Sequence, residues 1–506
     1  MFKYFDSLID KITMYKLLLY YLLALLAVAT GLSLFGGLHY KPLYIVIASV
    51  ILVVSCWTIN KILAAIFNAP TNNESSIITA LILALIITPN PTGYGITFLL
   101  AVSGLSMASK YILTINKKHI FNPAAIGIVL TALGPNQTAS WWVGTAAMLP
   151  FVFIGGIIIT RKVRRSRMIF SFFGSTFIAT IVYSLISKAS VTTSLHDLIF
   201  SSSVFFLGFV MLTEPFTSPP TAKKQTWYAA IVGFLLPPQA HVFSFYTTPE
   251  IALSIGNLFS YIVSPKTKLF PTIVQKVRTA SSSADFIFKT DREFAYLPGQ
   301  YMEWTLPHQK TDFRGNRRIF SLASSPTESD LRIGVKFFEN GSSFKRALLE
   351  IDENSQIVAS QVAGDFVMPK DEGQKLAFIA GGIGITPFRS MTKYLIDMQQ
   401  KRTVTLIYSA RSEKEISYKK LFDEAKKSIG LKTIYTISDS DMVTTDPAFR
   451  SGLITAELIK SEIPDFIERI FYISGTHQMV EAMQKTLTDL GVSRHQIKRD
   501  FFPGYV

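Results

Sequence analysis

Long apolar runs fill the first half of the chain and stop near residue 265. They lie near residues 17–35, 43–60, 76–88, 94–109, 122–133, 142–160, 168–187, 197–213, 227–240 and 248–264. A membrane-spanning helix needs about 20 apolar residues, so this pattern predicts an integral membrane domain over residues 1–264 with about ten crossings. The runs at 76–88 and 122–133 are too short for a full span, and we expect them to be half-helices buried among longer ones.

The second half has a different pattern. From about residue 270 the sequence has short alternating strands, and after about 375 strands alternate with helices. This order predicts an antiparallel β-barrel over residues 268–370 and an α/β nucleotide-binding domain over residues 371–506. The expected fold is therefore multi-domain, with a polytopic α-helical membrane domain, a β-barrel and an α/β domain.

Composition and charge agree with a membrane protein. Of the 506 residues 49% are hydrophobic, and the net charge is +15. The lysines and arginines of the first half gather in alternate loops and form no aromatic-interleaved patch, which favours a lipid bilayer over nucleic acid as the partner. The positive-inside rule then places the N-terminus, the basic loops and the C-terminal domains on the cytoplasmic side of a prokaryotic inner membrane. The first apolar run reads as a signal anchor rather than a cleaved signal peptide.

The scarcity of cysteine and the positions of histidine limit the cofactors. Cys56 is the single cysteine, which excludes an intramolecular disulfide framework and an iron–sulfur cluster held by several thiolates. The four histidines of the first half are expected at helix ends or in loops, which argues against bis-histidine haem: His39, His119, His196 and His241. No metal site is predicted, so electrons carried by this chain must use organic cofactors.

Two apolar segments end alike, Leu81–Pro91 and Phe206–Pro215, each closed by Thr and Pro. In the ten-crossing scheme they end on opposite faces, as in an inverted repeat of five crossings per half, with a site at the repeat interface. The alternative is that proline merely terminates these helices, as it does elsewhere.

The first half resembles a known membrane family through two motifs, FNPAAIGIVL at Phe121–Leu130 and FFLGFVMLTEPFTSPPT at Phe205–Thr221. The family contains the D subunit of the Rnf complex and the B subunit of the sodium-pumping NADH:quinone reductase, and the resemblance covers roughly residues 15–264. It implies two inverted repeats, a flavin in the membrane and a place in transmembrane electron transfer.

One departure from this family concerns flavin attachment. The family attaches FMN to the Thr of a Ser-Gly-Ala-Thr type motif, and no segment between Met168 and Ser203 matches that motif in full. The expectation is therefore a non-covalent FMN or riboflavin. The polar groups expected nearest to it are Asn122, Thr213, Glu214 and Thr217, and the alternative is that these residues only cap helix ends.

In the second half, a strand beginning at Arg318 carries side chains suited to a flavin. Arg318 can neutralise a pyrophosphate, Phe320 can stack on an isoalloxazine, and the hydroxyls of Ser321 and Ser324 can donate hydrogen bonds. Downstream, Ser342 or Ser343 is expected to cap a helix whose free N–H groups attract phosphate. A plain barrel strand and an ordinary capped helix are the alternatives.

Three later strands end in residues suited to a second nucleotide. The first, at 376–379, runs into Gly381, Gly382, Gly384, Thr386 and Pro387, where glycine permits close approach of a dinucleotide. The second, at 404–408, precedes Arg411, Tyr418, Lys419 and Lys420, which are expected near an adenosine ribose. The third, at 470–473, precedes Ser474, Gly475 and Met479.

Together these motifs resemble the ferredoxin-NADP reductase superfamily over residues 270–506. The resemblance implies that Arg318, Phe320, Ser321 and Ser343 hold FAD, that Gly381 to Pro387 hold the nicotinamide nucleotide, and that Phe502 shields the flavin. It implies a catalytic group of Ser321, Ser474, Asp500 and Phe502. Ser474 replaces the usual Cys and Asp500 the usual Glu, changes that hydride transfer should survive at an altered rate or selectivity.

The expected function is a membrane-bound reductase that passes electrons from NAD(P)H through FAD to a flavin, quinone or other acceptor. Arg411, Lys419 and Lys420 slightly favour NADPH over NADH, because they can bind a 2′-phosphate. Two alternatives stay open: a redox-driven sodium or proton pump, for which Glu214 is the candidate carboxylate, and a soluble-type reductase that the first half merely anchors. The redox partner is a quinone or another protein, and the oligomeric state is unknown.

Overall fold

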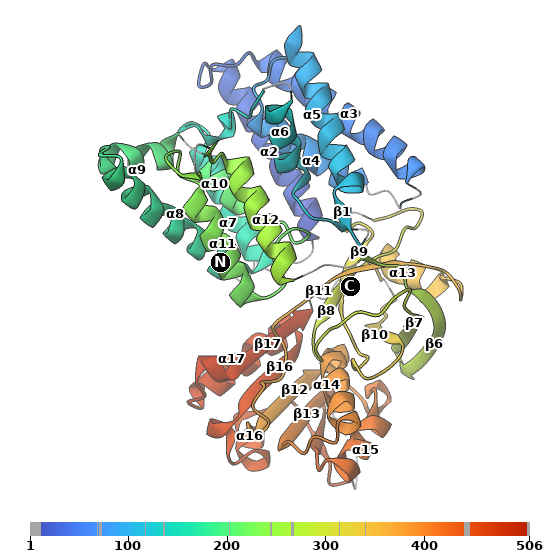
Figure 1. The fold of residues 1–506 in the computed structure, drawn as a ribbon. Helices are drawn as coiled ribbons and strands as arrows, with labels where there is room; N and C mark the ends of the chain where they lie inside the picture. The colour runs from blue at the N-terminus through green and yellow to red at the C-terminus, as the bar shows by residue number, and fades with distance from the viewer. Residues whose placement is uncertain are drawn as a thin grey trace. The chain divides into compact units, whose positions relative to one another are not determined.

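The computed structural model describes residues 12–502 except 68, 70–72, 117, 135–136, 202, 243–244, 265–267, 313, 340 and 440–445, and omits the side chains of Val242, Phe245, Gln361, Phe501 and Phe502. The chain forms two compact units, Met1–Thr267 and Lys268–Val506. Helices make up most of the first unit, and sheets with covering helices make up the second (Figure 1). The expected division at residue 370 falls between two strands of the second unit.

The helical unit contains α2 to α12. Their bounds are α2 Met14–Leu34, α3 Pro42–Ile66, α4 Asn73–Ile86, α5 Tyr94–Ile112, α6 Pro123–Leu133, α7 Leu149–Val163, α8 Ser166–Ile186, α9 Val191–Phe200, α10 Val204–Phe206, which continues as the π-helical turn η2 Leu207–Met211, α11 Ala222–Leu235 and α12 Pro249–Val263. A short helix η1, Trp142–Gly144, and two hairpins, β1–β2 (Thr114–Ile115, Lys118–His119) and β3–β4 (His241–Val242, Phe245–Tyr246), join them.

The expectation of ten crossings is wrong. Helices form in all ten apolar segments. Over the described part of the chain, however, only α2, α3, α5 and α8 are long and apolar enough to span a membrane. A fifth span is added if α9 and the α10–η2 segment, bent by 57° to one another, count as one. The physical reason is length, because α4, α6 and α12 have 14, 11 and 15 residues and a full span needs about 20.

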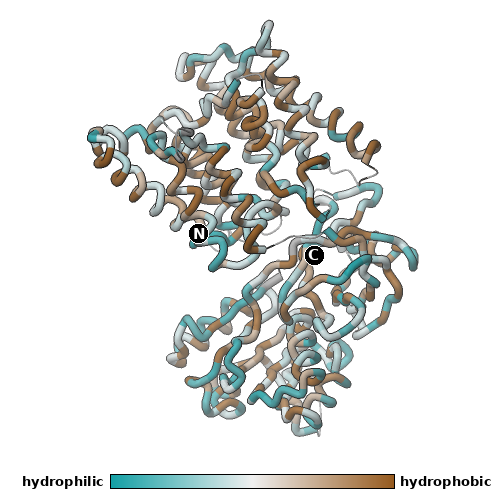
Figure 2. The backbone as a smooth tube through the Cα atoms, viewed as in Figure 1, coloured by the Kyte–Doolittle hydropathy of each residue, from teal (hydrophilic) through white to brown (hydrophobic). Residues whose placement is uncertain are grey.

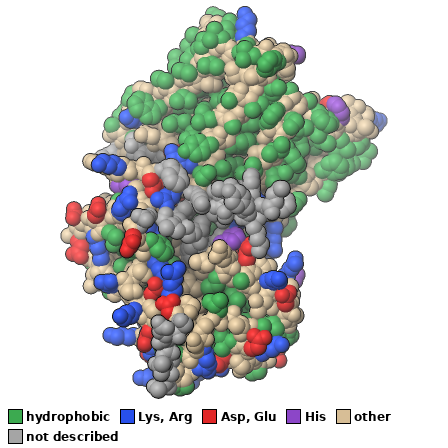
Figure 3. Space-filling model, turned by 180° about the vertical axis from the view of Figure 1, so that it is seen from behind, with side chains coloured by type: hydrophobic (Ala, Val, Ile, Leu, Met, Phe, Trp, Pro, Cys, Tyr) green, Lys and Arg blue, Asp and Glu red, His purple; other side chains and the backbone are tan. Residues whose placement is uncertain are grey.

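The four long helices bury only a minority of their apolar residues. In each, 28–33% of the most apolar window is buried inside the protein, and large side chains such as Phe170 and Ile178 are exposed at 76% and 61%. Hydrophobic residues run along these helices (Figure 2) and cover the visible face of the helical unit (Figure 3). Apolar surface of this extent suits a hydrocarbon environment.

The short helices α4 and α6 are buried, as the sequence indicates. Ten of the 14 residues of α4 are buried. Because a buried helix end needs partners for its last carbonyls, the Trp142 indole N–H donates to the carbonyls of Ala84 and Ile87 at 3.0 and 2.9 Å. Cys56, in α3, is also buried. His196 corrects an expectation, since it lies inside α9 rather than at a helix end, with its ring exposed.

The second unit begins with a barrel-type pair of antiparallel sheets. One has the order β10-β7-β6 and the other β5-β11-β8-β9. The strands are β5 Lys268–Leu269, β6 Thr272–Ala280, β7 Ser283–Lys289, β8 Tyr301–Thr305, β9 Arg317–Ser321, β10 Leu331–Lys336 and β11 Val358–Ala363, and helix α13 is Ser343–Glu350. Buried Phe286, Phe288 and Trp304 lie in the core between them.

A six-stranded parallel sheet follows, in the order β15-β14-β13-β12-β16-β17. The strands are β12 Leu376–Gly381, β13 Val404–Ala410, β14 Lys432–Ile437, β15 Phe449–Ser451, β16 Ile470–Thr476 and β17 Ile497–Phe502. The helices are η3 Gly382–Ile385, α14 Thr386–Asp397, η4 Glu413–Glu415, α15 Lys419–Ser428, α16 Ala456–Glu462, η5 Phe466–Glu468, α17 His477–Asp489 and η6 Arg494–Gln496.

Helices cover both faces of this sheet, so its central strands are apolar throughout. Phe378 of β12 packs in one core with Phe388 of α14. Its neighbour Ile379 belongs to the core on the other face, with Ile459 of α16 and Leu487 of α17. The carboxyl ends of β12, β13 and β16 meet at one edge, where ligands bind in such sheets.

Candidate functional site

Strand β9 presents the arginine of the expected flavin motif. Arg318 is 6% exposed, and its Nη1 donates to the carbonyls of Arg314, Gly315 and Arg317 at 2.9, 3.1 and 2.6 Å. The guanidinium lies 5.3 Å from the centroid of the Phe344 ring, and Phe320 lies 5.9 Å from the same ring. Arg318 and Phe320 are therefore brought to the start of α13, beside Ser343.

The N-terminus of α13 has a geometry suited to binding an anion. Ser342 is the N-cap, and its hydroxyl accepts from the Lys345 N–H at 3.4 Å. The carboxylate of Asp312 accepts from the Ser343 N–H at 2.9 Å, and the Ser343 hydroxyl accepts from the Asp312 N–H at 3.0 Å. Burial opposes the charge of Asp312, but hydrogen bonds from Ser343 and Arg314 hold its pKa below the usual value. A negative charge is thus stabilised at this helix end.

Several cations surround the same helix end. Arg314 donates to Asp312 from Nε and Nη2 at 3.1 and 2.9 Å, and Arg318 Nη2 lies 3.9 Å from the Asp312 carboxylate. Burial, then repulsion from Arg318, Arg314 and Lys336, lowers the pKa of Lys345 to about 8. The positive charges around Lys345 thus disfavour a further positive charge on its side chain. Such a concentration of cations suits a polyanion such as a diphosphate.

Three of the four expected catalytic residues lie together. The Ser321 hydroxyl donates to the Asp500 carboxylate at 3.3 Å, and Asp500 is the direct register partner of Ser474 on the neighbouring strand. Ser474 is fully buried, and its hydroxyl has no hydrogen-bond partner among the described residues. The fourth, Phe502, ends β17, but its side chain lies outside the described residues.

The glycine-rich turn after β12 packs closely against the end of β16. A Cβ on Gly384 would come within 2.4 Å of the Ser474 carbonyl oxygen, and one on Gly381 within 2.1 Å of the Met479 sulfur. Gly475 is packed less tightly, because a Cβ there would lie 3.0 Å from that sulfur. These glycines therefore bring β12, β16 and α17 together at the carboxyl edge of the sheet.

Gly382 has a different environment. Its φ is +53°, and a Cβ there would have no atom within 4 Å. Next to it, the Thr386 hydroxyl donates to the Ile383 carbonyl at 3.2 Å, and Pro387 occupies the first turn of α14. A half-buried glycine with open space in place of a Cβ, in the turn that leads into α14, lets a dinucleotide approach, as the motif predicts.

The residues expected near the adenosine ribose lie in different environments. Arg411 follows β13 at the carboxyl edge and is exposed, so its role in nucleotide binding stays a prediction. Tyr418, by contrast, donates to Asp285 of β7 at 2.5 Å, and burial and the Asp285 charge raise its pKa. Its hydroxyl is engaged with the barrel, so the contacts support a positioning role for Tyr418.

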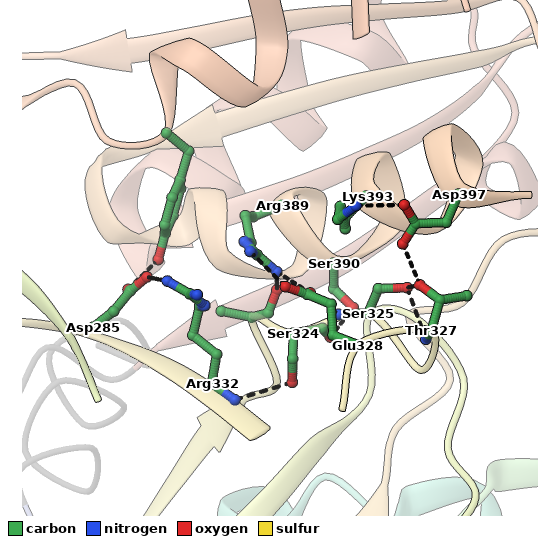
Figure 4. A network of polar contacts seen from close by, with 12 residues as sticks. Asp285, Ser324, Ser325, Thr327, Glu328, Arg332, Arg389, Ser390, Lys393 and Asp397 are labelled. Carbon is green, nitrogen blue, oxygen red and sulfur yellow. Dashed lines mark hydrogen bonds and ion pairs between the residues drawn. The ribbon is translucent and has the colours of Figure 1, made fainter. Parts of the chain in front are cut away.

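Ser324 belongs to a network that joins the barrel to α14 (Figure 4). Its hydroxyl accepts from Tyr296 and from the Arg332 N–H, and its carbonyl accepts from Ser390 at 2.6 Å. Arg389 donates to the Ala323 carbonyl at 2.9 Å and to both oxygens of Glu328. These contacts hold the loop after β9 against α14. Ser324 therefore positions β9, which carries the expected flavin motif, relative to the glycine-rich turn before α14.

In the helical unit, three of the four expected flavin-contacting residues form one cluster. Glu214 Oε2 accepts from Asn122 Nδ2 at 2.8 Å and from the Thr217 hydroxyl at 3.1 Å. Asn122 Oδ1 also caps α6 by accepting from the N–H groups of Ala124 and Ala125. Thr213 instead donates to the Phe209 carbonyl of its own helix at 2.8 Å. Both the helix-capping interpretation and a ligand role fit Asn122.

No group of three or more His, Cys, Asp or Glu residues suited to a metal occurs within the described part of the chain. The barrel site fits FAD through the buried arginine, the anion-binding helix end and the cation group. The sheet edge fits NAD(P)H through the open Gly382 and the buried hydroxyl of Ser474. The fold and these sites fit an NAD(P)H-dependent oxidoreductase that contains FAD.

Comparisons with known proteins point to the same class. Residues 378–485 match the family described as oxidoreductase NAD-binding domain. The flavohemoprotein of Bacillus cereus is 29% identical over 244 residues, 46% of this chain and 60% of that protein. The flavohemoprotein of Bacillus subtilis is 28% identical over 236 residues, 46% of this chain and 58% of that protein. The chain thus spans about three-fifths of the length of these relatives.

Solved structures similar to the chain cover the same half. The FAD/NAD-binding domain of a Vibrio cholerae nitric oxide dioxygenase has a TM-score of 0.41 at 20% identity and covers 46% of this chain and 98% of that one. A ferredoxin NADP+ reductase from Neisseria gonorrhoeae has a TM-score of 0.40 at 19% identity and covers 47% of this chain and 99% of that one.

Sequence reasoning missed Asp312, Arg314 and Lys345 at the helix end and Asp285, Glu328, Arg332 and Arg389 in the network. Only one of these carried a signal, because Arg389 follows Pro387 by two residues and so lies in the first turn of α14. Arg314 pairs with Asp312 only two residues away. No local spacing reveals the pairs Asp312–Ser343, Asp285–Arg332 and Glu328–Arg389, which are 31, 47 and 61 residues apart.

Proposed function

We propose that the whole chain is a membrane-bound reductase that takes electrons from NAD(P)H and delivers them, by way of FAD, to an acceptor in or across the membrane. The observation that carries the proposal is the meeting of Ser321, Asp500 and Ser474 at the point where the flavin strand reaches the carboxyl edge of the parallel sheet. Bound FAD would supply the step from a two-electron donor to one-electron acceptors.

The protein's own groups have distinct tasks in this proposal. Arg318 and the N–H groups at the start of α13 hold the diphosphate, and the Ser321 hydroxyl and Asp500 lie where the reacting ring edge is expected. The buried Ser474 hydroxyl is available to position the nicotinamide, because hydride transfer depends on close and well-oriented contact. Arg411, with Lys419 and Lys420, gives a slight preference for NADPH.

The first test uses the full chain purified in detergent. Oxidation of NADPH and NADH is followed with ferricyanide as the acceptor, and the proposal expects turnover with at least one of them. A preparation that binds FAD but oxidises neither nucleotide refutes the proposal.

For the acceptor, we propose a non-covalent flavin or a quinone in the helical unit. The resemblance of Phe121–Leu130 to a flavin-binding membrane family supports it, as does the clustering of Asn122, Glu214 and Thr217. Acid extraction followed by separation of FAD, FMN and riboflavin tests it. FAD with a second flavin supports a relay inside the membrane. FAD alone favours quinone, or a helical unit that serves only as an anchor.

Redox-driven cation movement is a second candidate, because Glu214 is a carboxylate with polar neighbours within the helical unit. Sodium or proton uptake by sealed vesicles during NAD(P)H oxidation tests it, and turnover without a gradient rejects it. The proposed location is the inner membrane, with the reductase unit in the cytoplasm where NAD(P)H is found.

A further inference from the structure

Asp312 places a carboxylate of the protein itself at the N-terminus of α13. It accepts from the Ser343 N–H at 2.9 Å and from Arg314 Nε and Nη2 at 3.1 and 2.9 Å, and it lies 3.9 Å from Arg318 Nη2. The Ser343 hydroxyl in turn accepts from the Asp312 main chain at 3.0 Å and contacts His308 Nε2 at 2.9 Å. One side chain therefore accepts hydrogen bonds from the helix end and from Arg314, and forms a longer ion pair with Arg318.

These donors are the ones that the FAD site requires. The fit of FAD to this unit rests on Arg318 and on the N–H groups at the start of α13, and Asp312 already accepts from the Ser343 N–H and pairs with Arg318 at 3.9 Å. Two negative charges at one helix end repel each other when only a few ångströms separate them. Asp312 and a flavin diphosphate thus compete for the same place.

We propose that Asp312 is an internal substitute for the flavin diphosphate, and that it must leave Ser343 before FAD can seat. This inference rests on FAD binding as part of the proposed function. Asp312 thereby sets the affinity and the association rate for FAD. In the absence of FAD it keeps the cation group around α13 neutralised, which stabilises the apoprotein.

The turn that carries Asp312 is built for such a movement. The Leu306 N–H donates to the Asn316 carbonyl at 3.0 Å, which fixes the two ends of the turn next to β8 and β9. Within it, Lys310 and Gly315 have φ of +53° and +70°, and the N–H groups of Arg314 and Gly315 donate back to Asp312 at 2.9 and 3.0 Å. Movement can therefore be confined to the turn and leave strand β9 in place.

The test compares Asp312→Asn with the wild type. FAD is removed from the purified full chain, and the dissociation constant and association rate for added FAD are measured by quenching of flavin fluorescence. We expect Asp312→Asn to bind FAD about tenfold more tightly and to associate faster, because the like charge is gone. The thermal midpoint of the FAD-free variant should fall, and the rise caused by FAD should increase.

Two further variants separate charge from other effects. Asp352→Asn makes the same change at an exposed position just beyond the other end of α13 and should bind FAD as the wild type does. Asp312→Glu keeps the charge and should not bind more tightly. If Asp312→Asn does not fold by circular dichroism, Asp312→Ser takes its place.

Unchanged or weaker FAD binding by the neutral variants overturns the inference, as does tighter binding by Asp312→Glu. If the wild type and Asp352→Asn bind no FAD at all, it is the proposed function that fails. The two failures are therefore distinguishable.

Discussion

The hydroxyl of Ser474 is buried at the sheet edge without a partner among the described residues. An unsatisfied buried hydroxyl costs about 1–3 kcal/mol, so removal of this group should not weaken the fold. We predict that Ser474→Ala leaves the free energy of unfolding unchanged or slightly raised. The same variant should lower kcat for NAD(P)H oxidation about tenfold through poorer positioning of the nicotinamide.

The matched control for Ser474 is Thr392→Val in α14, which removes another buried hydroxyl that lacks a described partner. This variant should change neither kcat nor KM. Urea unfolding measures the free energy of unfolding of each variant. Steady-state kinetics measure kcat and KM, and stopped-flow reduction of bound flavin measures the rate of hydride transfer. Equal rates in wild type and Ser474→Ala contradict the role proposed for Ser474.

Lys345 makes FAD binding depend on pH. Burial and the nearby arginines lower its pKa to about 8, whereas a bound diphosphate would raise that pKa by attraction. Above pH 8 the apoprotein must therefore take up a proton when FAD binds, so we predict weaker binding as pH rises, by at most about tenfold per pH unit. Below pH 8 the affinity should be flat.

Fluorescence titrations across pH 7 to 10 test this linkage, a range set by the pKa of about 8 for Lys345. Lys345→Met should abolish the pH dependence. Lys276→Met, which alters a half-buried lysine of β6 that donates to the Leu349 carbonyl, should retain it. A pH-dependent Lys345→Met protein would assign the titration to another group.

At the scale of elements, one arginine supplies three of the hydrogen bonds that hold helix α14 against the loop after β9. Arg389 contacts Glu328 with two nitrogens and the Ala323 carbonyl with one, and its guanidinium side chain is 9% exposed. We predict that Arg389→Met lowers the free energy of unfolding by about 2–4 kcal/mol, because it leaves Glu328 partly buried without its main counter-charge.

Lys393→Met, on the same helix, breaks a more exposed ion pair with Asp397. This variant should lower the free energy of unfolding by about 0.5 kcal/mol or less. Denaturant unfolding of both variants gives the comparison, and similar losses in the two would contradict the role assigned to Arg389.

The turn between β12 and α14 gives a second element-scale prediction. Gly384→Ala forces a Cβ to within 2.4 Å of the Ser474 carbonyl, so it should separate β12 from β16 and lower both stability and kcat. Gly382→Ala meets no atom within 4 Å. Its backbone cost of about 1–2 kcal/mol should be accompanied mainly by a higher KM for NAD(P)H. Steady-state kinetics separate the two effects.

The turn between β12 and α14 was predicted well from the sequence, because the features that define it are close together in the chain. Strand β12, its glycine turn and Pro387 at the start of α14 are contiguous, so their order alone indicates the structure. The same holds for Ser342 as a helix cap. The use of Tyr418 and Ser324 for positioning could not be predicted, because their partners Asp285 and Ser390 lie 133 and 66 residues away in the sequence.

For the whole molecule, the four apolar spans with largely unburied surfaces predict tight membrane association. The chain should remain in the pellet when membranes are washed with alkaline carbonate, and it should leave only with detergent. Immunoblotting of both fractions measures this. Release by carbonate would contradict a spanning role for α2, α3, α5 and α8.

The count of crossings is where sequence reasoning went wrong at this scale. Apolar character alone cannot separate a helix that faces lipid from one that is buried in protein, and α4 has ten buried residues in 14. The number of possible spans is set by helix length, which depends on where prolines and polar turns end each helix.

The burial of Cys56 in α3 also gives a practical advantage. Since the chain has no other thiol, a cysteine placed on the surface would be the one group open to maleimide reagents in the folded protein. Membrane-impermeant labels applied to right-side-out and inverted vesicles can therefore map which side each loop faces, without first building a thiol-free background.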